Sequence, residues 1–232
     1  MVGGFVNGLT GTGYALISLG FWLQAMAPTT AAPLVALCSV CGHAQALPSI
    51  WRGVRWPRLW PFLVAGLAGV PLGTLLLEHI HVQPLKLGVG LFLILYSAWM
   101  AFVRYPPRVR GGGRFADAAV GLAGGVMGGM ASLSGPAPII WVQLRGWGKD
   151  EQRGVLQPYN MAILFTALVS AGVAGFLDRT YLIWAVLSVP VSLAGTRLGL
   201  LLYRRVNDAG FRRLVLILLA LSGVTLIISA LR

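Results

Sequence analysis

Small hydroxyl side chains lie inside two glycine-rich segments, in a pattern that suits the binding of a small anion. Glycine interrupts a helix, and a helix that begins after such a break has unpaired backbone N–H groups at its N-terminus. These N–H groups, the positive end of the helix dipole and nearby hydroxyls form a neutral set of hydrogen-bond donors. The alternative is that the small residues only allow close helix packing. The candidate substrate-binding residues are Thr10, Gly11, Thr12 and Gly13 in the first segment and Ser132, Ser134 and Gly135 in the second.

The composition places these segments in a membrane. Of the 232 residues, 57% are hydrophobic and 10% are charged, whereas a soluble domain has roughly 25% charged residues. The mean hydropathy is +0.79. Several further stretches approach the ~20 apolar residues that cross a bilayer. They are residues 31–50, 59–77, 84–103, 154–176, 181–203 and 214–231. With the two glycine-rich segments they give eight apolar segments, so the predicted fold class is an all-α, multi-pass integral membrane protein.

An internal repeat relates the two glycine-rich segments. At an offset of 121 residues the segment 3–13 falls on 124–134, with three glycines coinciding, and at an offset of 126 Gly69 and Gly73 fall on Gly195 and Gly199. Each copy then has a broken, glycine-rich segment followed by three transmembrane helices. We expect a first membrane repeat at 1–103, a basic cytoplasmic linker at 104–115 and a second membrane repeat at 116–232.

The distribution of basic residues favours an inverted relation between the copies. If the segment 118–144 enters the membrane and returns on the same side, 14 Lys and Arg residues lie on one side and 3 on the other, with Arg197 inside a span. If that segment crosses the membrane, the bias disappears. Because basic loops collect in the cytoplasm, we predict that the second glycine-rich segment is a re-entrant hairpin, with Arg108 and Arg145 on the cytoplasmic face. The charge count does not test the first segment, but the repeat implies that it behaves alike. The loops also explain the net charge of +12, so no nucleic-acid partner is expected.

Five other side chains extend the candidate site. Asn160 falls opposite Ser39 at the repeat offset and lies next to Tyr159, which gives an amide, a hydroxyl and a phenol within spans. Interhelical hydrogen bonding is the alternative for these residues. Arg197 lies within a span, where it either binds the anion or extends to the interface. His43 is a possible proton-coupling residue or a structural histidine.

Metal and cofactor sites are not predicted. Cys38 and Cys41 lie inside an expected span and, with His43, supply three possible ligands at a spacing that misses haem attachment by one residue. We expect free thiols, no metal and no cofactor. The start of the chain also lacks the basic and cleavable regions of a removable signal peptide.

In its two glycine-rich openings, its matching glycine pairs and the basic residues at the last span of each copy, the chain resembles the sulfite exporter TauE/SafE family, also called the TSUP family of anion permeases. The first copy departs from the family pattern with Tyr14 and Ala15 where a further glycine and proline are common. The likeness implies a secondary transporter in a bacterial-type inner membrane for sulfite, thiosulfate or an organosulfonate, with protons as a possible coupling ion. The features that carry it are the glycine-rich openings at 4–13 and 125–135, the pairs Gly69/Gly73 and Gly195/Gly199, and the basic residues Lys86, Arg212 and Arg213 at the last span of each copy.

Two other classes of function compete with a transporter. A passive anion channel or a membrane assembly factor has the same composition, and saturable uptake separates a carrier from a channel. An intramembrane serine protease is suggested by the run from Ser132 to Gly135, with His43 as a conceivable base. The duplication argues against an enzyme, because Gly13 occupies the place of the serine Ser134 in the first copy.

Overall fold

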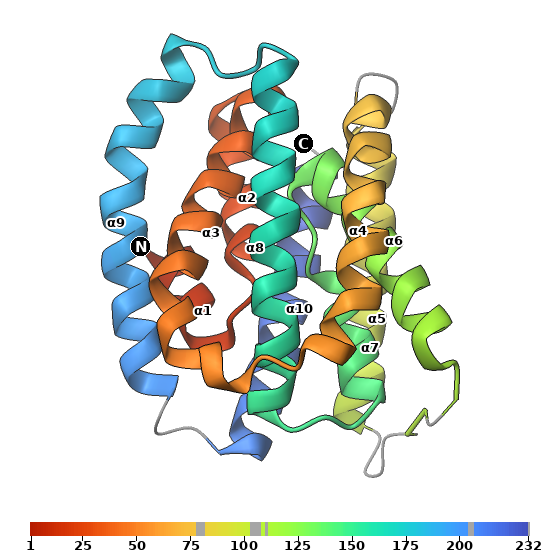
Figure 1. Ribbon diagram of the computed structural model, residues 1–232. Helices are drawn as coiled ribbons and strands as arrows, with labels where there is room; N and C mark the ends of the chain where they lie inside the picture. Colours follow the sequence, from red (N-terminus) through yellow and green to blue (C-terminus); the bar gives the residue numbers. More distant parts are fainter. Residues whose placement is uncertain (78–81, 103–107, 110, 204–206, 232) are drawn as a thin grey trace.

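The computed structural model of the chain describes residues 1–77, 82–102, 108–109, 111–203 and 207–231, and among these it contains helices and no strands (Figure 1). The first half contains α1 (Val2–Thr10), α2 (Tyr14–Ala25), α3 (Pro28–Ile50), the short 3₁₀ helix η1 (Trp51–Gly53), α4 (Trp56–Leu77) and α5 (Val82–Phe102). The second half contains α6 (Gly113–Ala131), α7 (Pro136–Leu144), α8 (Lys149–Val173), α9 (Arg179–Tyr203) and α10 (Asp208–Leu231).

Four of the described helices, α3, α4, α8 and α9, are long and apolar enough to cross a membrane. The prediction of a multi-pass, all-helical membrane protein is therefore confirmed. Several helices begin earlier than hydropathy alone suggested. The helix α8 begins at Lys149 because Asp150 and Glu151 stabilise its first turn, and α6 begins at Gly113, inside the segment assigned to the linker. Residues 103–107 and 110 of that linker lie outside the described residues.

Both glycine-rich segments are broken helices, as their sequences predict. In the first break the backbone takes left-handed conformations at Gly11 (φ 71°) and Gly13 (φ 95°), which glycine adopts without a steric penalty. In the second break Ser132 is left-handed (φ 56°), an unusual conformation for a residue with a Cβ. The helix α7 then begins at Pro136, where a proline removes no helical hydrogen bond.

Glycines bring the broken helices into backbone contact with helices of the other half. A Cβ at Gly125 of α6 would lie 2.0 Å from the carbonyl oxygen of Gly66 on α4, and a Cβ at Gly8 of α1 would lie 2.0 Å from that of Thr196 on α9. A side chain cannot fit at these distances, so glycine is required. The facing helices make the same kind of contact: Gly69 and Gly73 of α4 pack against α6, and Gly195 and Gly199 of α9 pack against α1.

The α6–α7 hairpin begins and ends at the same end of the bundle. The amide of Val109 donates to the carbonyl oxygen of Leu144 at 3.0 Å, and Arg145 Nη1 donates to that of Gly111 at 3.1 Å. Residues 51–55 and 145–148 lie at this lower end in Figure 1, and the connection 174–178 lies at the opposite end. Arg108 and Arg145 thus lie at one end of the bundle.

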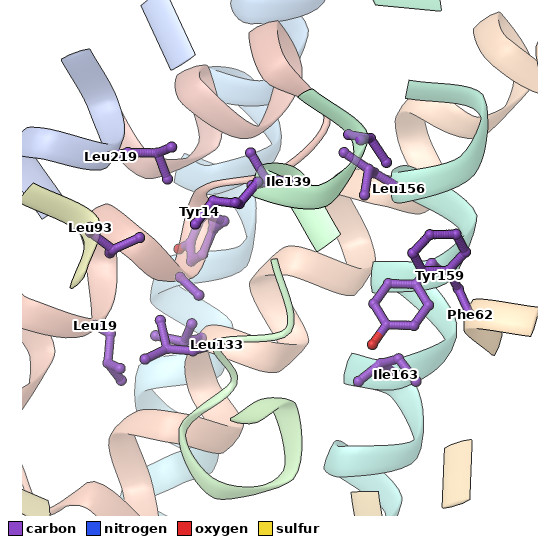
Figure 2. Packing of buried hydrophobic residues seen from close by; sticks show 14 of the residues in the cluster. Tyr14, Leu19, Phe62, Leu93, Leu133, Ile139, Leu156, Tyr159, Ile163 and Leu219 are labelled. Atoms are coloured by element: carbon purple, nitrogen blue, oxygen red, sulfur yellow. The ribbon is translucent and has the colours of Figure 1, made fainter. Parts of the chain in front are cut away.

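An apolar core surrounds the breaks. Leu133 and Ile139, which flank the second break, lie in the same buried cluster as Tyr14 from the start of α2 (Figure 2). The rings of Phe62 on α4 and Tyr159 on α8 meet edge to face with centroids 6.2 Å apart. This packing holds the two breaks next to each other in the middle of the chain's core.

Candidate functional site

The two helix breaks meet at a small internal cavity. The cavity has a volume of about 20 Å³, which is room for about one water molecule. Most of the predicted site residues line it, so segments that are more than a hundred residues apart come together here. The lining residues are Thr12, Gly13, Tyr14, Ala15, Ser39, His43, Ser132, Leu133, Ser134, Gly135, Pro136, Asn160 and Leu164.

Four residues of the predicted site do not line this cavity. The hydroxyl of Thr10 donates to the carbonyl oxygen of Val6 at 2.8 Å and also contacts that of Thr12, so it stabilises the break itself. Gly11 faces away, toward another part of α8. The buried Tyr159 donates its phenolic hydrogen to the carbonyl oxygen of Gly121 at 2.6 Å and thereby ties α8 to α6.

Arg197 is the fourth of these residues. Its side chain is exposed on α9, on a helix that carries many exposed apolar side chains. That position agrees with the alternative in which the long side chain extends toward the membrane interface.

The serines around the cavity already use their hydroxyl hydrogens within the protein. Ser132 donates to the carbonyl oxygen of Ala32 at 2.8 Å, and Ser39 donates to that of Val35 at 2.7 Å. Ser134 donates to Asn160 Oδ1 at 2.7 Å. Since a hydroxyl has one hydrogen, these serines orient their neighbours in this conformation, whereas the sequence suggested free donors.

Other donors at the cavity have no partner within the described protein. Asn160 Nδ2 and His43 Nδ1 are buried and without a hydrogen bond. The helix α2 starts at the cavity with no side-chain cap, and so does α7. Backbone N–H groups are therefore available from α2 but fewer from α7, because Pro136 and Pro138 have none. The donor set is less symmetric than the repeat alone predicts.

The electrostatics of the cavity favour an anion. Among the described lining residues there is no carboxylate, and the N-termini of two helices bring the positive ends of their dipoles. A buried amide N–H without a partner costs free energy, and an oxyanion is a ligand that would satisfy it. The described part of the chain contains no cluster of three His, Cys, Asp or Glu side chains, and both cysteines are free thiols, as expected.

Two polar residues near the cavity were not among the candidates drawn from the sequence. Arg153 and Asn7 are each 1% exposed. Arg153 was counted among the basic loop residues, but it lies one turn inside α8. A signal for it does exist, because Arg153, Gln157 and Asn160 follow one another at i, i+4 and i+7 and so form a polar stripe on one helix face.

Comparison with known proteins identifies the family. The family model described as "Sulfite exporter TauE/SafE" matches residues 1–226. A protein of Cupriavidus necator called "Probable sulfite/organosulfonate exporter TauE" is 28% identical over 203 residues, which cover 85% of this chain and 78% of that protein. No solved structure matches the chain. With its broken helices, membrane-length spans and a match over nearly its whole length, the chain belongs to the sulfite exporter TauE/SafE family of membrane transporters.

Proposed function

We propose that this protein is a secondary transporter that carries sulfite or a related sulfur oxyanion, such as thiosulfate or an organosulfonate, across the inner membrane. The observation that carries the proposal is the cavity between the two helix breaks, where uncapped helix N-termini and the unpartnered Asn160 Nδ2 meet without a carboxylate among the described lining residues. The family and the C. necator relative support the class of substrate.

We infer that the two halves are inverted repeats, each a re-entrant hairpin plus three spans. Matching glycine contacts support this relation. A Cβ at Gly69 would approach the carbonyl oxygen of Leu122 at 2.6 Å, and a Cβ at Gly195 would approach that of Met1 at 2.3 Å. Leu122 is the counterpart of Met1 at the offset of 121 residues. Thus α4 packs on α6 as α9 packs on α1, and this exchange between halves is what a two-fold axis in the membrane plane would produce.

A carrier fits the cavity better than an open channel. Sulfite is larger than the space available, so binding requires the helices to move apart, which is the behaviour of an alternating-access carrier. The protease alternative has little support from the geometry, because Ser134 donates its hydrogen to Asn160 and not to His43.

We propose His43 as the coupling residue. Among the described lining residues, its imidazole is the side chain that can take up a proton on a ring nitrogen, and its Nδ1 has no hydrogen-bond partner. Its counterpart in the second half is Leu164, which also lines the cavity. If His43 carries a coupled proton, His43→Leu abolishes the effect of a pH gradient on uptake while leaving sulfite exchange at equal pH intact.

Transport by purified protein in liposomes tests the function. We expect saturable uptake of ³⁵S-labelled sulfite, competition by thiosulfate and a short alkanesulfonate, and stimulation by the same anion preloaded inside, which a channel does not show. Radioactive rubidium is the control cation and should not enter. Absence of uptake for all three anions, with correctly inserted protein, would refute the proposed function.

A further inference from the structure

A second group of buried polar side chains lies beside the cavity, with hydrogen-bonding atoms that no described residue satisfies. Arg153, Gln157 and Asn7 are each 1% exposed. Arg153 Nη1, Gln157 Nε2 and both polar side-chain atoms of Asn7 have no partner. Arg153 and Gln157 are hydrogen-bonded neighbours on α8, and Asn7 directly precedes Gly8, whose carbonyl oxygen accepts from Arg153. Each unsatisfied atom costs free energy when it is buried, so their occurrence in adjoining stretches of α1 and α8 points to a missing ligand.

The positive charge of Arg153 is not neutralised by an ion pair with a described residue. Its Nε donates to Gln157 Oε1 at 3.0 Å, and its Nη2 donates to the carbonyl oxygen of Gly8 at 2.9 Å. The guanidinium carbon lies 4.1 Å from the centroid of the Tyr203 ring. Asp150 acts on Arg153 electrostatically, but its carboxylate accepts the hydrogen bond of the Tyr203 hydroxyl. A buried charge whose direct contacts are all neutral remains costly even with Asp150 in electrostatic range, and a bound anion would lower that cost.

The group adjoins the cavity on the side where α8 begins. A Cβ at Gly11, in the first break, would lie 3.0 Å from Arg153 Cγ and 3.1 Å from Gln157 Oε1. His43, which lines the cavity, is within electrostatic range of Arg153. On α8, Arg153 precedes Asn160 by seven residues, a rise of about 10 Å along the helix. The polar stripe therefore leads from the cavity toward the end of the bundle that holds Arg108 and Arg145.

The repeat shows that helix packing alone does not require these side chains. At the offset of 121 residues their counterparts are small or apolar: Gly128 for Asn7, Leu164 for His43, Ala32 for Arg153 and Ala36 for Gln157. The close helix packing is the same in both copies, although the contacting side chain is polar in one copy and apolar in the other. A Cβ at Gly42 would lie 2.5 Å from Asn7 Nδ2, and a Cβ at Gly128 would lie 2.6 Å from Ile163 Cγ2. The C-terminus of α6, which corresponds to that of α1, is capped by the backbone amide of Ser132 and has no arginine among its capping groups.

We propose that Arg153, Asn7 and Gln157 form a second anion subsite, through which the oxyanion passes between the cavity and the end of the bundle where α8 begins. The planar fork of guanidinium N–H groups matches two oxygens of a sulfonate or sulfite group, and the amides of Asn7 and Gln157 supply further donors. At the repeat-related positions Ala32 and Ala36 supply no such group, so the two halves are expected to differ in their affinity for anions. This inference rests on the proposed transport function.

The test measures the half-saturation concentration for ³⁵S-sulfite uptake in liposomes. Asn7→Ala is the sharpest variant because neither polar atom of this side chain has a hydrogen bond to lose. We expect its half-saturation concentration to rise about tenfold, as for loss of a hydrogen bond to a charged ligand, with no fall in melting temperature without ligand. Arg153→Lys keeps the charge but not the fork, and we expect an increase of similar size. Arg179→Gln, which removes an exposed charge at the start of α9, is the matched control and should change the value less than twofold.

The outcomes separate the subsite from the transport function. Wild-type uptake with unchanged half-saturation in both Asn7→Ala and Arg153→Lys overturns the subsite and leaves the transporter standing. No anion uptake by the wild type overturns both. If Arg153→Lys does not fold, Asn7→Ala decides alone, since a purely structural cluster predicts no change in its affinity for sulfite.

Discussion

Asn160→Ala is predicted to weaken substrate binding without weakening the fold. In the structure Asn160 is 2% exposed, its Oδ1 accepts the hydrogen bond of Ser134, and its Nδ2 has no partner. The side chain thus makes one hydrogen bond within the protein and keeps a second group, an N–H donor, directed to no described residue at the wall of the cavity.

The two effects of Asn160→Ala on stability oppose each other. Loss of the bond to Ser134 costs about 0.5–1.5 kcal/mol, and removal of the unsatisfied donor returns about 1–3 kcal/mol. The free energy of unfolding without ligand therefore falls little or rises. A hydrogen bond from Nδ2 to a charged oxyanion contributes about 1.5–3 kcal/mol, and every 1.4 kcal/mol is a tenfold change in affinity. We expect the affinity for sulfite to fall by about tenfold to a hundredfold.

The assay pairs thermal melting with sulfite uptake on the same purified protein. Tyr159→Phe is the control from the neighbouring position, because Tyr159 bonds Gly121 and does not line the cavity. That change is expected to lower stability by about 1 kcal/mol and to leave sulfite affinity unchanged. A lower melting temperature for Asn160→Ala together with wild-type affinity would refute the reasoning, because it would make Asn160 a structural residue only.

Three further changes test the architecture. Gly125→Ala places a methyl group 2.0 Å from the Gly66 carbonyl oxygen, and we expect a loss of at least about 1–3 kcal/mol from forced separation of α4 and α6, seen as a lower melting temperature. Gly13→Ala forces a Cβ into a left-handed backbone at φ 95°, which costs roughly 1–2 kcal/mol, and the shift of the α2 N-terminus should reduce sulfite affinity. Cysteines at Arg108 and Arg145 are expected to react with a membrane-impermeant reagent from the same, cytoplasmic, side; labelling from opposite sides would exclude the hairpin.

The helices and breaks were predictable because their signals are local. Glycine at Gly11 and Gly13 and proline at Pro136 mark where one helix stops and another starts, and hydropathy marks the spans. The starts of α6 and α8 were placed too late, because polar first turns such as the one that begins at Lys149 are helical but not apolar. Hydropathy detects the bilayer core and not the helix end.

The sequence predicted most of the polar residues that line the cavity, but it did not predict their roles. The repeat in the sequence predicted that Ser132, Ser134 and Asn160 belong to one site. Which hydroxyl donates to which acceptor depends on tertiary geometry, so the use of Ser134 as an orienting group for Asn160 could not be read from spacing. The burial of Arg153 could not be predicted, because a basic residue near the end of a span is ordinarily a solvent-exposed topology determinant.

The exchange of partners between the halves has a consequence for biogenesis. The nine-residue α1 leaves the ribosome well before α9, which begins at Arg179, yet its close backbone contact is with α9. In contrast, α4 is synthesised before α6, so α6 can pack against it as soon as it emerges from the ribosome. Because a helix break in lipid leaves backbone groups unsatisfied unless it is buried in protein, the first broken segment cannot complete its packing until α9 has been synthesised. Maturation of the substrate cavity is therefore tied to synthesis of the C-terminal half, and a truncated chain that ends before α9 would expose α1 to the quality-control proteases of the membrane.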